Sequence, residues 1–403
     1  MKLMRPSLKI TVYLLAFILA ACGGGGGDST TITTAIQSGD YTSTNLAQNA
    51  ISFSVQNIDG NDVNLPYVSV NICQPGTTKC KIVPNVLLDT GSIGLRILSS
   101  VLGDLQLSSQ TFNNVPVAEC ATFLNGVTWG PVKIADIKMS SEVASSIPIQ
   151  VIDDANYLTA PTRCSNGLPT LQSYSKLRAN AILGVGLLIA DGQKYYACAS
   201  NLGANCTTST IPLPPSSQVQ NPVASFATNN NGIIMQLPSI GSSGAVSVTG
   251  SLFFGIDTQS NNSSSGASII PTNSSGYFTT TFNSVTLTSF IDSASNGLFF
   301  PAGNQSTVLT SCKTSSGFYC PDTTQSFTAN IPLQNNTTGI INFSIANAEA
   351  LFATRNAAFN NLGGVLQNQF DWGLPFFFGK TVYFGITDKA STSALGPYYG
   401  YKN

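Results

Sequence analysis

The sequence contains no histidine, and only 9% of its 403 residues are charged. Without histidine it can build neither a Ser-His-Asp nor a Cys-His nucleophile, nor a histidine-containing zinc site. Its 17 basic and 18 acidic residues give a net charge of −1, so no basic face is available for a nucleic-acid backbone. We therefore expect no nucleic-acid partner, and in an enzyme we expect carboxylates to serve as acid and base.

A hydrophobic run long enough to span a bilayer is also missing. The apolar stretch at residues 10–18 is too short, and it lies between a basic segment and small residues that precede Cys22. This order is typical of a signal peptide, and small residues before a cysteine resemble a bacterial lipobox. We predict that residues 1–21 are removed and that Cys22 carries a lipid anchor. An ordinary secretory peptide cleaved nearby is the alternative.

The residues after Cys22 predict where the anchored protein resides. Residues 23–27 are all glycine and open a stretch rich in Gly, Ser and Thr, so residues 22–47 are expected to form a flexible tether. The residue directly after Cys22 is Gly23 and not aspartate, and this pattern resembles that of lipoproteins that are sent on to the outer membrane. We therefore predict a lipid-anchored protein of the cell envelope, held at the outer membrane on its periplasmic or surface side.

The remaining cysteines predict disulfide bonds. Nine cysteines minus Cys22 leave eight, an even number in a chain that we expect to be exported. Three close pairs bracket short polar loops, which leaves two cysteines for a fourth pair. Of the 105 possible pairings we choose Cys73 with Cys80, Cys120 with Cys164, Cys198 with Cys206 and Cys312 with Cys320. No Cys-x-x-Cys pair is present, so we predict no metal and no cofactor.

The patterning of the remaining chain predicts strands. Short runs rich in Val, Ile, Phe, Tyr and Thr recur between clusters of Asn, Gly, Ser and Pro, for example at residues 67–72, 131–139 and 246–254. Such runs are typical of β-strands separated by turns. Helical periodicity is scarce and is best developed over residues 345–359. We predict a mostly β protein with a few short helices.

One motif occurs twice in the chain. Residues 86–97 (VLLDTGSIGLRI) and 289–300 (SFIDSASNGLFF) share the order apolar-apolar-Asp-hydroxyl-small-Ser-x-Gly-Leu, and their aspartates lie 203 residues apart. Each copy precedes an apolar-apolar-Gly segment. The first, residues 182–184, ends 95 residues after Asp89, and the second, residues 377–379, ends 87 residues after Asp292. Two such halves imply a duplicated lobe.

The duplicated motif resembles the pepsin-like aspartic peptidases, whose two lobes each carry Asp-Thr/Ser-Gly at a strand-to-loop corner. Weaker matches follow in order along the chain, at residues 66–72, 250–257, 277–287 and 377–388. The resemblance implies a bilobal double β-barrel or sandwich with two duplicated lobes, residues 48–258 and 259–403. Residues 128–132 and 374–386 also resemble an uncharacterised family of bacterial lipoproteins with a domain of unknown function.

The resemblance implies roles for particular residues. Asp89 and Asp292 would form a catalytic pair that shares one proton and activates water. The supporting residues of the two loops would be Thr90, Gly91, Ser92, Ser293, Ala294 and Ser295. An Asn-Gly hairpin signal at residues 125–126 would form the flap over the cleft, with Phe123 or Trp129 as its aromatic residue, unless both are core residues.

Three features depart from the family's pattern. Ala294 replaces a glycine, and its methyl group is expected to crowd the loops or to resist their backbone angles. Arg96 replaces an aromatic residue and would need a partner if buried. A Tyr-Gly flap is not evident. We therefore carry two functions forward, a membrane-anchored aspartic endopeptidase and, as the alternative, a catalytically inactive pepsin-fold surface lipoprotein that binds peptide or glycan. We expect a monomer with a peptide or protein substrate.

Overall fold

The computed structural model describes residues 47–60, 62–157, 159–199 and 206–403, and residues 43–403 cluster as one compact unit. The predicted signal peptide, the lipidation site Cys22 and all but the last residue of the predicted tether lie outside the described residues. Among the helices of the described ranges, none is long and apolar enough to cross a membrane.

The described chain is mostly β-strand, as predicted. The strands before residue 258 are β1 (Ala50–Gln56), β2 (Pro66–Cys73), β3 (Cys80–Asp89), β4 (Ile93–Leu98), β5 (Thr111–Phe112), β6 (Val115–Phe123), β7 (Gly126–Met139), β8 (Glu142–Ile152), β9 (Ala181–Val185), β10 (Lys194–Ala197), β11 (Gly232–Leu237) and β12 (Ser247–Phe254). Those after it are β13 (Ser268–Pro271), β14 (Phe278–Phe282), β15 (Val285–Ile291), β16 (Leu298–Phe299), β17 (Gln325–Pro332), β18 (Thr338–Ile345), β19 (Gly363–Gly364), β20 (Gln369–Trp372), β21 (Lys380–Gly385) and β22 (Tyr398–Lys402).

The helices are short. The α-helices of the described residues are α1 (Thr162–Ser165), α2 (Tyr174–Leu177) and α3 (Ala348–Ala353), and the 3-10 helices are η1 (Ser99–Val101), η4 (Pro215–Ser217), η5 (Val223–Ser225), η6 (Gly303–Gln305) and η7 (Leu374–Phe377). Helix α3 covers only part of the predicted helix. It begins after Asn347, whose side chain caps the backbone NH of Ala350, and it ends before Arg355, whose φ of 61° cannot continue a helix.

The two halves repeat one arrangement of four strands. In the first half β9 lies parallel to β3 and antiparallel to β4, and β4 lies parallel to β8. In the second half β20 lies parallel to β15 and antiparallel to β16, and β16 lies parallel to β19. Strand pairing therefore confirms the duplication that the two sequence motifs predicted.

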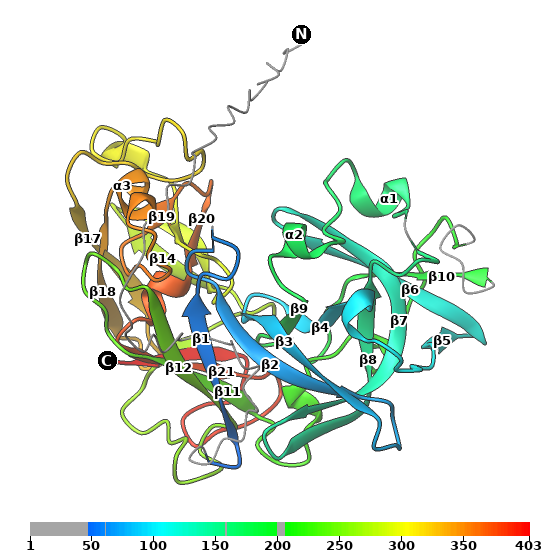
Figure 1. Ribbon diagram of the computed structural model, residues 1–403. Coiled ribbons are helices and arrows are strands. Elements are labelled where there is room, and N and C mark those ends of the chain that lie inside the picture. Colours follow the sequence, from blue (N-terminus) through cyan, green and yellow to red (C-terminus); the bar gives the residue numbers. More distant parts are fainter. Residues whose placement is uncertain (1–46, 61, 158, 200–205) are drawn as a thin grey trace, which may run out of the picture. The chain divides into compact units, whose positions relative to one another are not determined.

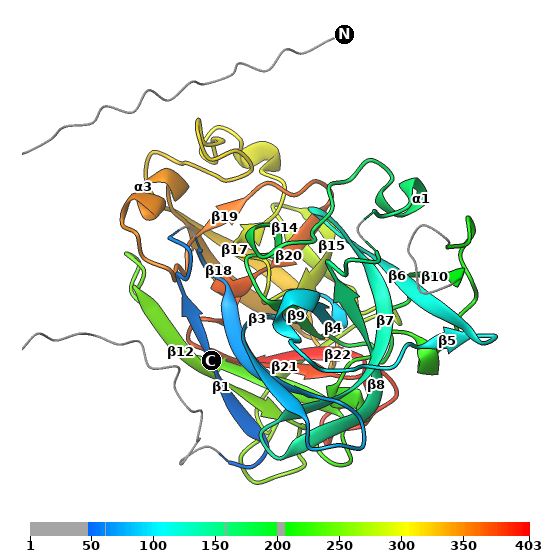
Figure 2. The same cartoon turned by 45° about the vertical axis from the view of Figure 1, so that its right-hand side comes forward.

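A single sheet joins the two halves. It has 15 strands among the described residues, and where the halves meet its neighbouring strands are, in order, β1, β12, β11, β21, β22 and β13. Figure 1 labels β1, β12, β11 and β21, and Figure 2 labels β22 beside β21. The first three come from before residue 258 and the last three from after it. One cluster of buried apolar side chains, from Phe53 and Leu88 to Phe370 and Tyr399, also runs through both halves. The two motif corners are therefore held in one packed framework.

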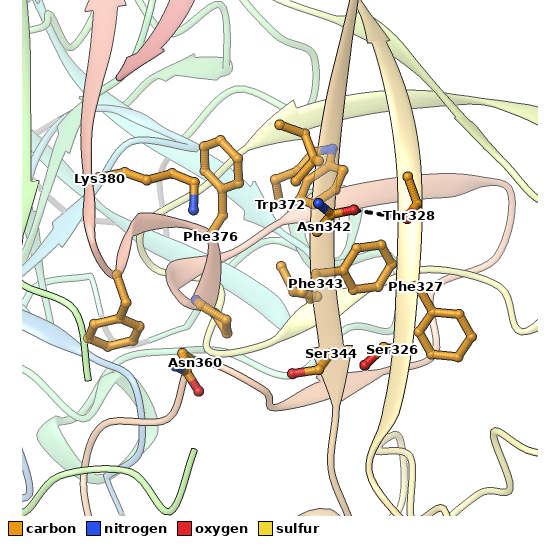
Figure 3. Close-up of a pocket in the computed structure, with 14 residues that line it drawn as sticks. Ser326, Phe327, Thr328, Asn342, Phe343, Ser344, Asn360, Trp372, Phe376 and Lys380 are labelled. Carbon is orange, nitrogen blue, oxygen red and sulfur yellow. Dashed lines mark hydrogen bonds between the residues drawn. The ribbon is translucent and has the colours of Figure 1, made fainter. Parts of the chain in front are cut away.

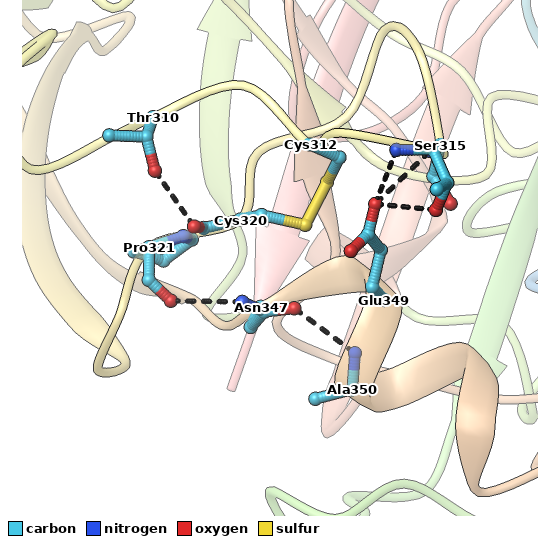
Figure 4. Close-up of a disulfide and its surroundings, with 9 residues drawn as sticks. Thr310, Cys312, Ser315, Cys320, Pro321, Asn347, Glu349 and Ala350 are labelled. Atoms are coloured by element: carbon cyan, nitrogen blue, oxygen red, sulfur yellow. Dashed lines mark hydrogen bonds between the residues drawn. A yellow bond between two sulfur atoms is a disulfide. The ribbon is translucent and has the colours of Figure 1, made fainter.

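The four predicted disulfide bonds are confirmed. They link Cys73 to Cys80, Cys120 to Cys164, Cys198 to Cys206 and Cys312 to Cys320. Glu349 lies close to the last pair, but both sulfur atoms are bonded to each other (Figure 4). A carboxylate oxygen of Glu349 accepts hydrogen bonds from the backbone NH and hydroxyl of Thr314, both at 2.6 Å. The Glu349 carboxylate thus bonds to the neighbouring loop, and the disulfide-bonded Cys312 and Cys320 offer no thiolate ligand for a metal ion.

Candidate active site

Asp89 is the last residue of β3, where the strand turns into the first motif loop. It lies in register beside Gly184 of β9. A Cβ on Gly184 would lie 2.6 Å from backbone atoms of Ile93, so only glycine lets β9 pass this close to the loop. The predicted apolar-apolar-Gly segment at residues 182–184 thus supports the loop that carries Asp89.

The second half corrects the sequence prediction. The strand parallel to β15 is β20, and the carbonyl of Trp372 accepts a hydrogen bond from the backbone NH of Asp292 at 3.1 Å. The glycine that supports this loop is Gly373, where a Cβ would lie 2.1 Å from a backbone carbonyl oxygen. Phe377 instead ends η7, and residues 378–379 connect η7 to β21. The prediction was wrong because Asp371 occupies an apolar position, so the sequence Asp-Trp-Gly does not match the pattern.

Two buried hydroxyls lock the motif loops together. Thr90 Oγ1 accepts a hydrogen bond from the backbone NH of Ser293 at 2.8 Å and donates to the carbonyl of Ile291 at 3.4 Å. Ser293 Oγ accepts from the backbone NH of Thr90 at 3.1 Å and donates to the carbonyl of Leu88 at 2.7 Å. Each loop therefore holds the backbone of the other, which fixes the two aspartates relative to one another.

The first loop surrounds the Asp89 carboxylate with donors. The backbone NH groups of Gly91 and Ser92 donate to its Oδ1 at 2.8 and 3.1 Å, and Ser92 Oγ donates to its Oδ2 at 2.5 Å. Burial and then the charge of Asp292 nevertheless raise the pKa of Asp89 to about 7, against the lowering effect of these donors. Two carboxyl groups that resist ionising together titrate as a pair and retain one proton.

The second loop supplies matching donors to Asp292. The backbone NH of Ala294 donates to its Oδ1 and Ser295 Oγ to its Oδ2, both at 2.8 Å. Ala294 does not adopt a positive φ, and its side chain packs against the cluster that contains Leu87. The structure thus corrects the expectation that alanine would strain or crowd the loops. Gly91 is the sensitive position, because a Cβ there would lie 2.5 Å from Cγ of Asp292.

The aspartates lie at the floor of a cleft with two cavities. One, of about 340 Å³, contains Asp371 in its wall, and the other, of about 260 Å³, contains Ile182. Both cavities are lined by Asp89, Asp292 and Phe123. Phe123 ends β6 at the tip of the β6–β7 hairpin, so this flap candidate reaches the cleft. Both aspartates therefore border both cavities.

The other flap candidate does not reach the cleft. Trp129 is fully buried, and its ring packs against Tyr157 and Tyr196 with ring centroids 6.3 and 5.6 Å away. These residues form a separate hydrophobic core beneath the hairpin. Phe123 precedes the hairpin turn and Trp129 follows it, so the sequence could not show which of the two reaches the cleft and which lies in the core.

Arg96 is buried beside the cleft and bonds to two carboxyl groups, although its Nε and Glu119 Oε2 have no hydrogen-bond partner among the described residues. Its guanidinium donates to Glu119 and Asp191, both at 2.6 Å, and to the carbonyl of Ile93 at 2.6 Å. Its Cζ lies 5.5 Å from the ring centroid of Phe123. Burial raises the pKa of Glu119 well above its usual range, although Arg96 opposes the shift. The charge of Arg96 is therefore compensated by the chain's own carboxyl groups.

Sequence reasoning missed another buried carboxyl group at the cleft. Asp371 lies on β20, is 1% exposed and lines the larger of the two cavities. Burial and then the charge of Asp292 raise the pKa of Asp371 well above its usual range. One sequence feature could have identified Asp371. It is an acidic residue in place of the first apolar residue of an apolar-apolar-Gly segment, 79 residues after Asp292 (371 − 292).

A further cavity lies away from the aspartates. It has a volume of about 500 Å³ and is formed by β17, β18 and the segment before β21. Figure 3 shows Phe327, Phe343 and Phe376 around it, with Lys380 at one side and Asn342 hydrogen-bonded to Thr328. It contains neither Asp89 nor Asp292 and is no part of the candidate active site.

Comparisons with known proteins agree with this geometry. The chain belongs to a family of proteins of unknown function (DUF3443), whose model matches residues 45–401. It is similar to the crystal structure of the aspartic proteinase from Irpex lacteus, with a TM-score of 0.53 over 88% of this chain and 97% of that chain. At 14% identity this likeness shows the fold alone, and it confirms the predicted bilobal pepsin-like architecture. A search of curated protein sequences finds no match.

Proposed function

We propose that this protein is an aspartic endopeptidase in which Asp89 and Asp292 activate water. The observation that carries the proposal is the reciprocal Thr90–Ser293 lock, which holds two donor-surrounded carboxyl groups in one cleft. The ionised aspartate would take a proton from a water molecule as the water oxygen attacks the carbonyl carbon of the peptide bond. At the same time the protonated aspartate would give its proton to the carbonyl oxygen. The aspartate that took the proton from water would then give it to the departing nitrogen as the C–N bond breaks, and the other aspartate would take back a proton from a hydroxyl of the tetrahedral intermediate.

The raised pKa of Asp89 supports this mechanism because the reaction needs one carboxyl group ionised and one protonated. The flap candidate Phe123 supports it too, since it lines both cavities and would help to exclude water from a bound substrate. Two of the three donors to Asp89, the Gly91 NH and the Ser92 hydroxyl, have counterparts at Asp292 in the Ala294 NH and the Ser295 hydroxyl, so the alanine does not favour an inactive protein.

The experiment is cleavage of an unstructured peptide library by the purified full-length protein from pH 3 to 8. We expect cleavage that a statine-type inhibitor blocks and that Asp89→Asn and Asp292→Asn each reduce by about 10²–10⁴-fold. Asp322→Asn, a change of an exposed aspartate outside the cleft, serves as the matched control. Absence of cleavage by correctly folded protein at every pH would overturn the proposal and favour the peptide- or glycan-binding lipoprotein.

The same proposal includes a lipid anchor in the cell envelope. We infer that the signal peptide of residues 1–21 is removed and that Cys22 is lipidated for transfer to the outer membrane. The family match begins at residue 45, so the anchor would lie before the folded body. We expect palmitate labelling of the wild-type protein and its loss in Cys22→Ser. Labelling that survives this substitution would exclude the anchor without affecting the peptidase proposal.

A further inference from the structure

The placement of Asp371 follows from the alternation of side chains along β20. Its neighbours Phe370 and Trp372 both face the core, where their rings stack with centroids 4.3 Å apart. Asp371 therefore faces the opposite side, toward the cavity of about 340 Å³. Within the described part of the chain, its Oδ1 has no hydrogen-bond partner although the side chain is 1% exposed.

The equivalent position in the first half holds an apolar residue. Ile182 of β9 lies between Leu87 and Arg96 on the flanking strands, as Asp371 of β20 lies between Phe290 and Phe299. Ile182 thus shows that an aliphatic side chain fits the position that Asp371 occupies in the second half. A buried carboxyl oxygen without a partner is unfavourable for folding, so the fold by itself gives no reason for the acid.

The chain does not compensate Asp371 as it compensates Arg96. Among the ion pairs of the described residues, Arg96 bonds to two carboxylates and Asp371 to no cation. Besides the Ser295 hydroxyl, which opposes the rise in its pKa, the groups that act on Asp371 are Asp292 and Asp89, both carboxyls. Arg96 lines the same cavity, but its guanidinium is already bonded to Glu119 and Asp191. No cation of the described residues pairs with Asp371, so a cationic group of a ligand that enters the cleft would serve as its partner.

We propose that Asp371 selects substrates with a lysine or arginine side chain on the Asp292 side of the scissile bond. Phe290 and Tyr277 line the same cavity and would contact the methylene groups of that side chain. The ammonium or guanidinium group would reach Asp371 at the wall, where charge-assisted hydrogen bonds are strong because water is excluded. The inference rests on the proposed function, since it assumes that the cleft binds an extended peptide across Asp89 and Asp292.

The first test is the cleavage-site profile of the full-length protein on a peptide library. We expect enrichment of Lys and Arg at one of the two positions that flank the scissile bond, and its loss in Asp371→Asn and Asp371→Ile. The matched control Ile182→Asn puts the same amide at the equivalent site of the first half. It is expected to alter the preference at the other flanking position and to retain the basic preference. Wild-type cleavage without a basic preference would overturn the inference and leave the proposed function standing.

The second test measures binding, so that the inference can be judged even if no peptide is cleaved. Hydroxyethylene-isostere peptides carry either lysine or norleucine on one or the other side of the isostere. We expect wild-type protein to bind one lysine peptide at least about tenfold more tightly than its norleucine partner. Asp371→Asn should remove this ratio, and Ile182→Asn should keep it. A ratio near one in the wild type, or one that survives both Asp371 substitutions, would overturn the inference.

Discussion

The two halves build the same strand framework around their aspartates but fill two matched positions differently. Arg96 and Phe299 each lie seven residues after a motif aspartate (96 − 89 and 299 − 292). Across the neighbouring strand, Arg96 pairs with Ile182 and Phe299 pairs with Asp371. The first half thus combines a cation with an aliphatic side chain, whereas the second combines an aromatic ring with an acid.

The comparison distinguishes Arg96, whose charge is used within the fold, from Asp371, which we propose binds a charged group of a ligand. Arg96 is buried with Glu119 and Asp191, so its charge is compensated before any substrate arrives. Asp371 lacks such compensation and faces the cleft. Duplicated frameworks can therefore keep the same catalytic geometry while the cleft walls on their two sides acquire different preferences.

The largest effect is expected when the first half receives the residue of the second. Arg96→Phe would leave the carboxyls of Glu119 and Asp191 buried without their cation. We expect the free energy of unfolding to fall by about 3–5 kcal/mol, measured by urea denaturation at pH 7. Adding Glu119→Gln and Asp191→Asn to Arg96→Phe should recover part of this loss. A loss below about 1 kcal/mol for the single variant would show that the ion cluster is not structural.

The next effect concerns the small residue of each motif loop. Gly91→Ala would place a Cβ 2.5 Å from Cγ of Asp292, so the carboxyl must move. We expect peptide cleavage to fall by about 100-fold, equivalent to about 2.7 kcal/mol. The reciprocal change Ala294→Gly should leave cleavage within about threefold, because the same NH donates to Asp292 in either case. Equal losses in the two variants would contradict the asymmetry between the loops.

A smaller effect is the pH dependence of stability. The pKa of Asp89 rises from 3.8 to about 7 in the folded protein, so the folded state holds a proton that the unfolded chain releases between these values. The resulting stabilisation is present below pH 4 and is lost as the pH rises to about 7. Relative to Asp89→Asn, wild-type stability should fall by up to about 1.4 kcal/mol per pH unit over this window, measured by urea unfolding.

Asp292→Asn tests whether the two halves share that proton. Removing the charge of Asp292 removes the second largest cause of the raised pKa of Asp89. The pH dependence of unfolding should therefore become shallower in this variant than in the wild type. An unchanged slope would mean that burial alone holds the proton on Asp89. Cleavage by the wild type should also decline above about pH 7, as the pair loses its shared proton.

The sequence predicted the parts of the site that depend on local residue patterns. The two motifs with Asp89 and Asp292 predicted the paired loops, and close cysteine spacing indicated three of the disulfide pairs. The partners of Arg96 could not be predicted, because Glu119 and Asp191 lie 23 and 95 residues away along the chain (119 − 96 and 191 − 96). The supporting Gly373 was missed since Asp371 interrupts the apolar pattern that identified Gly184.

The smallest effect would make the second half more like the first. Asp371→Ile installs the type of residue that β9 carries at position 182, and it removes a buried carboxyl oxygen that has no partner among the described residues. We expect the free energy of unfolding to rise by about 1 kcal/mol at pH 7, because relief of the unpaired acid outweighs the strain of a bulkier side chain. Urea denaturation measures this gain, and Ile182→Val provides a control for repacking on the matched strand.

Stability and specificity should then move in opposite directions in one variant. If Asp371 is retained for a cationic side chain of the substrate, Asp371→Ile should be more stable than the wild type and yet lose the basic preference. A substitution that destabilises the protein by more than about 1 kcal/mol would instead mean that Asp371 contributes to folding. Its unpaired oxygen would then reflect a structural role, and the contrast with Arg96 would no longer separate structural charge from ligand-binding charge.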